Sequence, residues 1–453
     1  MKSINPATHE VIKEYELMDD KILDDIVHRA ALAQDDWRKN SFDERASILR
    51  KVAKILKSNK SDYARLMARE MGKPLPQGES ESEKCAWVCN YYTDNAEDFL
   101  SDEVIESDAD KSYVTYNPLG TVLAIMPWNF PFWQLFRFGA PALMAGNAAI
   151  LKHAPNVTGC ALAIEDIMHK AGIPKDLFRT VIADVDQTQE LITHRDIHAV
   201  TLTGSTRAGK AVASKAGSVL KKTVLELGGS DPYVILADAD IENTAETCVT
   251  SRLINSGQSC IAAKRFIVVE DNYDEFLEAV IEKMKAKKIG DPFESVTDIG
   301  PMAREDLRDQ LHDQVQLSVK RGANCVIGGE IPDNDGAFYP PTVLTDITNV
   351  MPAYDQELFG PVATVIKVRD EEEAIEVAND TNYGLGAAIF SEDIDHAEEI
   401  AANELQAGCC FINEFVKSDP RLPFGGIKNS GYGRELSHFG IKEFVNIKTV
   451  YRA

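Results

Sequence analysis

One cysteine of this chain lies in a setting that favours chemical reactivity. Cys260 is part of the segment NSGQSCIAAKR, residues 255–265, between small polar residues and a short apolar run. A cysteine attacks as its thiolate, and an ordinary pKa of about 8.5 leaves only a small fraction ionised at neutral pH. A loop beside Gly257 predicts access for a substrate, so Cys260 is a candidate nucleophile, and an inert core thiol is the alternative.

Two other polar residues could assist such a thiol. Glu226 ends the apolar segment KTVLE, and burial at a strand end raises the pKa of a carboxyl group towards the range of a general base. Asn129, in MPWNFP, follows a predicted buried strand, and its amide could donate a hydrogen bond to an oxyanion. A solvated strand-end charge and a turn asparagine are the alternative interpretations.

A further group of residues could hold a nucleotide. Lys152 ends another predicted strand, and TGSTRAG, residues 203–209, is a strand-to-helix turn whose helix N-terminus could bind pyrophosphate. The segment QELFGPV supplies Glu357 and Phe359, a carboxylate and a ring that could contact a ribose and a flat heterocycle. Each motif also has an ordinary structural explanation, so none of them decides the function alone.

These candidates lie at the ends of predicted strands in an α/β chain. Residues 20–100 carry apolar residues at helical spacing, and from residue 120 strands and helices alternate as in a parallel sheet. Ligands bind outside the carboxyl ends of such strands, so we expect the motifs to meet there. The alternation restarts after ELGGSDP, which predicts a second α/β domain. The terminal strand in residues 444–453 needs a partner, either residues 103–116, another subunit or both.

Composition excludes several classes of protein. The net charge of −24 over 453 residues argues against a nucleic-acid partner. No apolar run reaches the roughly 18 residues of a membrane-spanning helix, and the first residues lack an apolar signal segment. We therefore expect a cytoplasmic protein with no membrane partner. The eight cysteines are too sparse for a disulfide scaffold, and no paired Cys or His motif predicts a metal site.

Taken together, the motifs resemble the NAD(P)-dependent aldehyde dehydrogenase superfamily. PWNFP, LELGGSDP, NSGQSCIAAKR, ELFGPV and PFGGIKNSGYGRE occur in the order and at the intervals of that family, over essentially the whole chain. The resemblance implies an α/β, aldehyde dehydrogenase-like fold assembled into a homodimer or homotetramer. It implies a Rossmann-like cofactor-binding domain (1–101 and 120–227), an α/β catalytic domain (228–428) and small β oligomerisation or bridging strands (102–119 and 429–453).

The resemblance also implies a role for each candidate residue. Cys260 is the nucleophile, Glu226 the general base, and Asn129 the oxyanion donor together with the Cys260 backbone N–H. The implied reaction oxidises an aldehyde to a carboxylic acid through a thiohemiacetal and a thioester, with NAD or NADP taking the hydride. The residues expected to contact the cofactor are Trp128, Lys152, Pro155, Gly204, Ser205, Leu227, Glu357 and Phe359.

Within the superfamily the chain is similar to bacterial succinate-semialdehyde dehydrogenases, in the segments ILKHAPN and GRELSHFG. Arg137 and Ser418 match positions that bind the substrate in that group. Some members carry a second arginine six residues before the nucleophile, where this chain has Ile254, and Arg421 is a candidate replacement. Glutarate semialdehyde or another small aldehyde is the alternative substrate. A cysteine hydrolase or acyltransferase, or a structural protein on the same scaffold, is the alternative of a different class.

Two further positions depart from common family patterns. NAD-selective members often carry a glutamate three residues after the lysine, and here that position is Pro155. Without this carboxylate nothing repels a 2′-phosphate, so we expect both NAD and NADP to be used. A redox-switch cysteine found two residues after the nucleophile in some members is replaced by Ala262.

Overall fold

Four helices and a short hairpin precede the first large sheet in the computed structural model, which describes residues 1–453. The helices are α1 (Asp20–Trp37), α2 (Phe42–Ser58), α3 (Lys60–Met71) and α4 (Leu75–Phe99). Ser41 caps α2 reciprocally with Glu44, and Gly72 ends α3 in the left-handed conformation. The hairpin of β1 (Lys2–Ile4) and β2 (Val11–Glu14) was not predicted, since its side chains are mostly exposed and form no apolar alternation.

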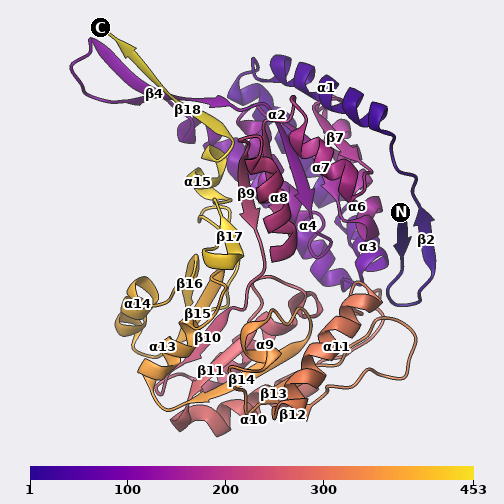
Figure 1. The fold of residues 1–453 in the computed structure, drawn as a ribbon, viewed down its shortest axis with the longest axis vertical. Helices are drawn as coiled ribbons and strands as arrows, with labels where there is room; N and C mark the ends of the chain where they lie inside the picture. The colour runs from indigo at the N-terminus through magenta and orange to yellow at the C-terminus, as the bar shows by residue number, and fades with distance from the viewer.

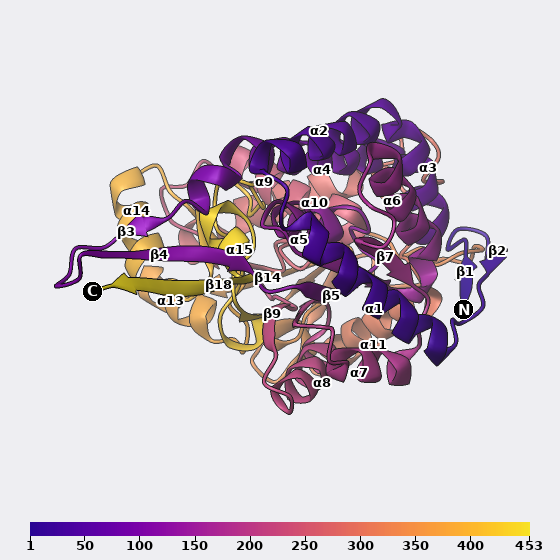
Figure 2. The same ribbon diagram turned by 90° about the horizontal axis from the view of Figure 1, so that it is seen from above.

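A six-stranded sheet forms the first α/β unit. Its strands are β5 (Thr121–Met126), β6 (Ala148–His153), β7 (Phe178–Val181), β8 (Ala199–Thr203), β9 (Lys222–Glu226) and β17 (Gly431–Tyr432). They are connected through α5 (Trp133–Met144), α6 (Thr158–Ala171), α7 (Val185–Thr193) and α8 (Thr206–Gly217). Figure 2 shows α2, α4 and α6 on one side of β5 and β9, and α7 and α8 on the other. Helices therefore cover both faces of the sheet, which is why its strands read as continuous apolar runs.

The strand order of this sheet reverses beside β5. The order is β17-β9-β8-β5-β6-β7, so the chain moves from β5 outwards through β6 and β7 and then returns to β8 on the other side of β5. Strands β5 to β9 are all parallel. A reversal of this kind leaves a crevice at the carboxyl ends of the two strands, where α/β folds bind ligands.

A seven-stranded sheet forms the second α/β unit, below the first in Figure 1. Its order is β12 (Asn324–Ile327), β13 (Thr342–Thr345), β14 (Val362–Val368), β11 (Arg265–Val269), β10 (Pro232–Ile235), β15 (Gly386–Phe390) and β16 (Cys409–Ile412). The helices of this unit are α9 (Ile241–Leu253), α10 (Tyr273–Lys285), α11 (Glu305–Lys320), α12 (Pro352–Asp355), α13 (Glu371–Asn379) and α14 (Ile394–Asn403). Only β12 is antiparallel to its neighbour, and the central strands β10 and β11 are buried along their whole length. Cys409 and Cys410 lie in the edge strand β16 and are half-buried.

A three-stranded ribbon extends away from the first unit. It consists of β3 (Glu103–Val104), β4 (Lys111–Pro118) and the terminal strand β18 (Val445–Arg452), which follows α15 (Ser437–Lys442). The strand β18 pairs antiparallel with β4 over the whole length of both, so the partner of the terminal strand lies in its own chain. Figures 1 and 2 show that the paired strands project from the body.

The short strand β17 lies outside this ribbon. It pairs antiparallel with β9, so residues 431–432 join the six-stranded sheet although the expected bridging segment 429–453 included them. A Cβ atom at Gly431 would lie 1.9 Å from the carbonyl oxygen of Leu225, so only glycine allows this close approach. No helix has both the length and the apolar character required to span a membrane.

Candidate active site

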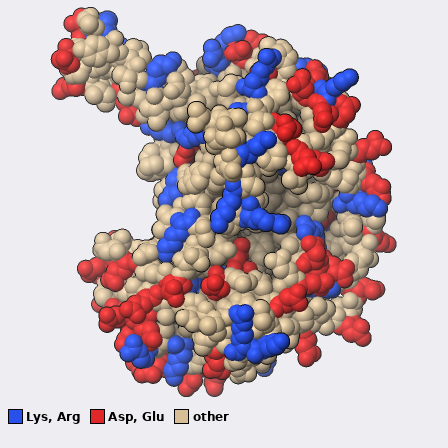
Figure 3. Space-filling model, in the orientation of Figure 1, with Lys and Arg blue, Asp and Glu red and all other residues tan.

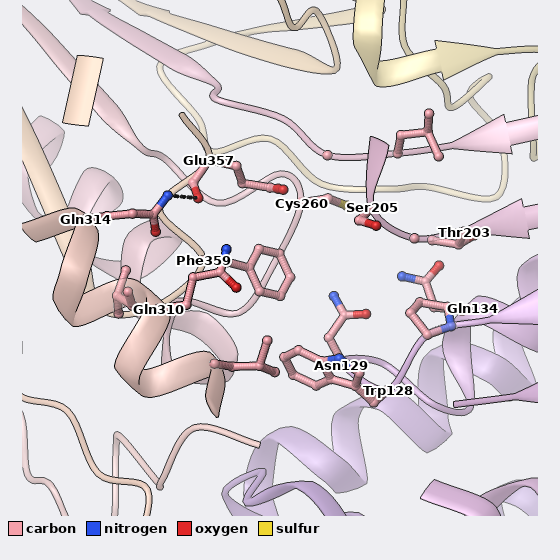
Figure 4. A pocket seen from close by; sticks show the side chains of 16 residues that line it. Trp128, Asn129, Gln134, Thr203, Ser205, Cys260, Gln310, Gln314, Glu357 and Phe359 are labelled. Carbon is pink, nitrogen blue, oxygen red and sulfur yellow. Dashed lines mark hydrogen bonds between the residues drawn. The ribbon is translucent and has the colours of Figure 1, made fainter. Parts of the chain in front are cut away.

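The carboxyl ends of β5 and β8 meet at the strand reversal and bring two of the motifs together. Trp128 and Asn129 follow β5, whereas Gly204 and Ser205 follow β8. All four residues line one cavity of about 230 Å³, the first cavity. Figure 4 shows Trp128 and Asn129 on one side of it and Glu357 and Phe359 opposite. The topology therefore explains why motifs separated along the chain share one site.

Cys260 reaches this site from a strained loop that follows α9. Asn255, Ser256 and Gly257 have φ values of 56°, 56° and 76°, so three consecutive residues are left-handed. A Cβ atom at Gly257 would lie 2.3 Å from the backbone of Gly360, so the loop and the segment after Phe359 are in close backbone contact. Strain of this kind persists only where the surrounding structure fixes it, and it is common at functional sites.

Hydrogen bonds fix the loop on both sides of the cysteine. Asn255 Nδ2 donates to the carbonyl oxygens of Asn129 and Gln258 at 2.8 and 3.0 Å, and Asn129 Nδ2 donates to the Gln258 carbonyl at 3.1 Å. Lys264 Nζ donates to the carbonyl of Cys260 at 2.6 Å and also to those of residues 259 and 262. Lys264 could not be predicted from the sequence, because a lysine beside a strand is usually solvated.

The surroundings of Cys260 favour its neutral thiol. Burial raises the pKa of Cys260 to about 12, although nearby Arg137 and Lys264 lower it. The backbone N–H of Cys260 has no acceptor within hydrogen-bond distance. The side chain is half-buried, not sealed in the core. The loop position predicted from the sequence is therefore confirmed, and the thiol needs a base to ionise.

Glu226 is a buried carboxyl group that receives no hydrogen bond from its neighbours. It is 2 % exposed, and neither carboxyl oxygen has a hydrogen-bond partner. Burial, followed by the nearby Glu435, raises its pKa well above the ordinary value, as the sequence predicted for a buried strand end. A Cβ atom at Gly425 would lie 2.7 Å from Glu226 Oε1, so the carboxyl group lies directly against backbone. A buried carboxyl group without partners costs stability, which makes it a candidate for chemistry.

The first cavity contains the groups that a dinucleotide requires. The helix α8 begins at Ser205, whose Oγ accepts from the Ala208 N–H, so the positive end of a helix faces the cavity. The rings of Trp128 and Phe359 meet edge to face with centroids 5.7 Å apart. Glu357 accepts a hydrogen bond from the Gly229 N–H at 3.0 Å. A Cβ atom at Gly228 would lie 2.4 Å from Glu357, so the glycine leaves room for this carboxylate.

The structure separates two expected cofactor residues from this cavity. Six of the eight, namely Trp128, Gly204, Ser205, Leu227, Glu357 and Phe359, line the first cavity, and Lys152 and Pro155 do not. Lys152 is the second-last residue of β6, the strand next to β5, and its ammonium group makes no hydrogen bond or ion pair. Burial lowers the pKa of Lys152, and nearby Asp184 raises it. Pro155 starts a short 3₁₀ turn and is exposed, so this position adds no carboxylate to the site.

A second cavity of about 390 Å³ lies on the other side of Cys260. Cys260 and Gln134 line both cavities. The walls of the second cavity are partly aromatic, from Phe130, Trp133, Phe415 and Phe424, and include Arg137 and Ser418. Figure 3 shows a hollow between the two units with both basic and acidic side chains around it.

Arg137 is buried in the wall of this cavity and is not a charge on the surface of its helix. It is 2 % exposed and forms an ion pair with Glu435, while Nη2 donates to Thr203 Oγ1 at 3.3 Å. Its guanidinium lies 4.7 Å from the centre of the Phe424 ring. The charge of Arg137 is therefore already paired within the protein.

Two other arginines considered from the sequence lie elsewhere. Arg421 pairs with Asp419 at 2.6 Å and stacks on Trp87, outside the lining of the second cavity. Arg252 is fully buried and donates to the Gly257 carbonyl at 2.6 Å, which fixes the loop. Lys84, from α4, does line the cavity and was missed, because one lysine in a long amphipathic helix carries no motif.

Comparison with known proteins decides the family. The profile of the aldehyde dehydrogenase family matches residues 1–450. The chain belongs to the aldehyde dehydrogenase family. This confirms the resemblance drawn from the five motifs and the predicted α/β fold, and it counts against the hydrolase and structural-protein alternatives.

Individual relatives within the aldehyde dehydrogenase family cover almost the whole chain. A Synechocystis protein named "Probable succinate-semialdehyde dehydrogenase [NADP(+)]" is 47% identical to this chain. The match covers 100% of this chain and 99% of the Synechocystis protein. The Escherichia coli protein named "Succinate semialdehyde dehydrogenase [NAD(P)+] Sad" is 45% identical, over 99% of this chain and 97% of the Escherichia coli protein. The crystal structure of succinic semialdehyde dehydrogenase from Streptococcus pyogenes in complex with NADP+ superposes with a TM-score of 0.97, at 41% identity and covering 99% of both chains.

Proposed function

We propose that this aldehyde dehydrogenase oxidises succinate semialdehyde to succinate, with NAD or NADP as the hydride acceptor. The observation that carries the proposal is the position of Cys260 between two cavities, one suited to a dinucleotide and one with aromatic walls and basic groups. The names of the three relatives support the same substrate.

Cys260 and Asn129 carry the first step of the proposed mechanism. The Cys260 thiol releases its proton to water, the resulting thiolate attacks the aldehyde carbon, and the carbonyl oxygen gains negative charge. The remaining Asn129 Nδ2 hydrogen and the free Cys260 N–H stabilise that oxygen, and one such donor is typically worth about 3–4 kcal/mol. The hydrogen bonds through Asn255 keep both donors in place before the substrate arrives.

Glu226 serves as the general base. Once the acyl group is bound to the sulfur as a thioester, Glu226 takes a proton from the attacking water and the acid is released. Its raised pKa makes it a stronger base than an exposed carboxylate, the tuning that proton transfer near neutrality requires.

The cofactor is held at the end of the first sheet in this proposal. Ser205 and the N-terminus of α8 bind the pyrophosphate, Glu357 binds a ribose, and Trp128 and Phe359 border the rings. When bound, the nicotinamide supplies an acceptor for the hydride that the aldehyde loses. Lys152 faces the adenosine ribose, and the absence of a carboxylate at Pro155 favours acceptance of a 2′-phosphate as well as a 2′-hydroxyl.

The domains have separate tasks in this proposal. Residues 1–101 and 120–227 bind the cofactor, and residues 228–428 supply the nucleophile. The ribbon of β3, β4 and β18 joins copies into a homodimer or homotetramer, supported by exposed apolar side chains of Val104 (73%) and Ile447 (61%). Light scattering tests this assignment, with an expected mass of two or four times 50.0 kDa.

The function is tested by following absorbance at 340 nm with NAD and with NADP. Succinate semialdehyde, glutarate semialdehyde and butanal are compared at equal concentrations. We expect the highest kcat/KM for succinate semialdehyde. A higher value for butanal contradicts the proposed substrate class, and a higher value for glutarate semialdehyde moves the assignment to the longer acid.

A further inference from the structure

Three cationic side chains line the second cavity, and they differ in what they pair with. Arg137 pairs with Glu435, and Lys417 pairs with Glu414 at 2.6 Å. Lys84 has no carboxylate within 4.0 Å. An ammonium group without a counter-ion is the one that gains most from binding an anion.

The ammonium group of Lys84 is held at the cavity by uncharged groups. Its Nζ donates to Ser418 Oγ at 2.9 Å and lies 4.5 Å from the centre of the Trp133 ring. A serine hydroxyl that accepts from a lysine still has its own hydrogen to donate. Lys84 and Ser418 thus present two adjacent donors, which matches the two oxygens of a carboxylate.

The nearby acidic group on α4 is already occupied. Glu81 pairs with Lys73 and accepts hydrogen bonds from the backbone N–H groups of Phe132 and Trp133 at 2.9 and 3.0 Å. Desolvation, followed by the charge of Arg137, lowers the pKa of Lys84 to about 8. Both effects reflect an unpaired positive charge that a substrate carboxylate would neutralise.

We propose that Lys84, together with Ser418, binds the carboxylate of the substrate at the end remote from the aldehyde. This inference rests on the proposed oxidation of an acidic aldehyde. The positive charge of Lys84 then selects substrates that carry a carboxylate. Arg137, held by Glu435, is part of the cavity wall. The aromatic side chains of Trp133 and Phe424 contact the methylene groups of the substrate.

The test compares two lysines of the same cavity. Lys84→Met is expected to lower kcat/KM for succinate semialdehyde about 10- to 100-fold, mainly through KM, with a much smaller change for butanal. Lys84→Arg should recover most of the loss. Lys417→Met is the matched control, since that lysine is paired. Equal losses in both methionine variants, or an unchanged ratio of acidic to neutral substrate in Lys84→Met, overturn the proposal.

Binding of succinate separates this inference from the proposed function. Calorimetry should detect succinate binding to the wild type and at least a 10-fold weaker affinity in Lys84→Met. If the enzyme oxidises only neutral aldehydes but still binds succinate through Lys84, the proposed substrate is wrong and the carboxylate site stands. If succinate semialdehyde is preferred and Lys84→Met changes neither turnover nor succinate affinity, the site is wrong and the function stands.

Discussion

The two cavities that meet at Cys260 draw their walls from different parts of the chain. The first is formed largely by residues that follow strand ends, such as Asn129 and Ser205, whereas the second takes Lys84, Trp133 and Arg137 from helices α4 and α5. Strand ends are marked in a sequence by glycines and prolines after apolar runs. On a helix, no sequence pattern distinguishes the residues that face a cavity from the other residues of that helix. Cofactor contacts are thus easier to infer from sequence than substrate contacts.

Replacing the sulfur that both cavities share has the largest expected effect. Cys260→Ser should lower kcat at least about 1,000-fold with every aldehyde, because a serine hydroxyl in this apolar position is a far weaker nucleophile. Turnover is measured at 340 nm, and thermal unfolding checks that the variant folds. Activity close to wild type would contradict the role of Cys260.

Replacing Glu226 should slow hydrolysis of the thioester, a later step than the attack that replacing Cys260 should slow. Glu226→Gln should lower steady-state turnover about 100- to 1,000-fold, since water must then attack without a proton acceptor. Rapid mixing should still show one equivalent of reduced cofactor formed in the first turnover. Loss of that first turnover would place Glu226 in the attack step instead.

The pH dependence distinguishes the second cavity from the first. For butanal, kcat/KM should rise towards alkaline pH, because burial holds the Cys260 thiol protonated with a pKa of about 12. For succinate semialdehyde this rise should level off above pH 8, since lysine is charged only below its pKa and that of Lys84 is about 8. The ratio of the two substrates should drop about 10-fold between pH 7 and pH 9.

The groups that face Lys84 do not account for such a change. Arg137 and Glu81 are each held in an ion pair, and the hydrogen bond from Arg421 holds the pKa of Asp419 below its ordinary value. Cys85, one residue further on α4, has a pKa raised well above its ordinary value by burial. If kcat/KM depends on pH in the same way for both substrates, the prediction is contradicted. It is also contradicted if the pH dependence of their ratio is the same in Lys84→Arg as in the wild type.

The smallest expected effect concerns the first cavity alone. Lys152→Met should raise KM for NADP about 3- to 10-fold and leave KM for NAD within about 2-fold, because only the 2′-phosphate needs a cation. Initial rates at saturating aldehyde measure both constants. An equal change for the two cofactors would show that Lys152 does not discriminate between them.

Much of the fold could be predicted because buried parallel strands and amphipathic helices leave strong patterns. The predicted strands from β5 to β16 are present, and Gly172 ends α6 as expected, at φ 106°. The missed elements, β1, β2, β12 and β17, are short or exposed and carry no comparable pattern. The ion pair of Arg137 with Glu435 was also out of reach, because it joins residues almost 300 positions apart.

The backbone contact between Gly257 and Gly360 joins the two cavities mechanically. The loop that bears the sulfur touches the segment that bears Glu357 and Phe359, with no side chain between them to absorb a shift. A shift of either loop therefore changes both the contacts of Glu357 and Phe359 and the direction in which the Cys260 thiol points. Natural variation should tolerate no larger residue at either glycine, however freely the rest of both loops changes.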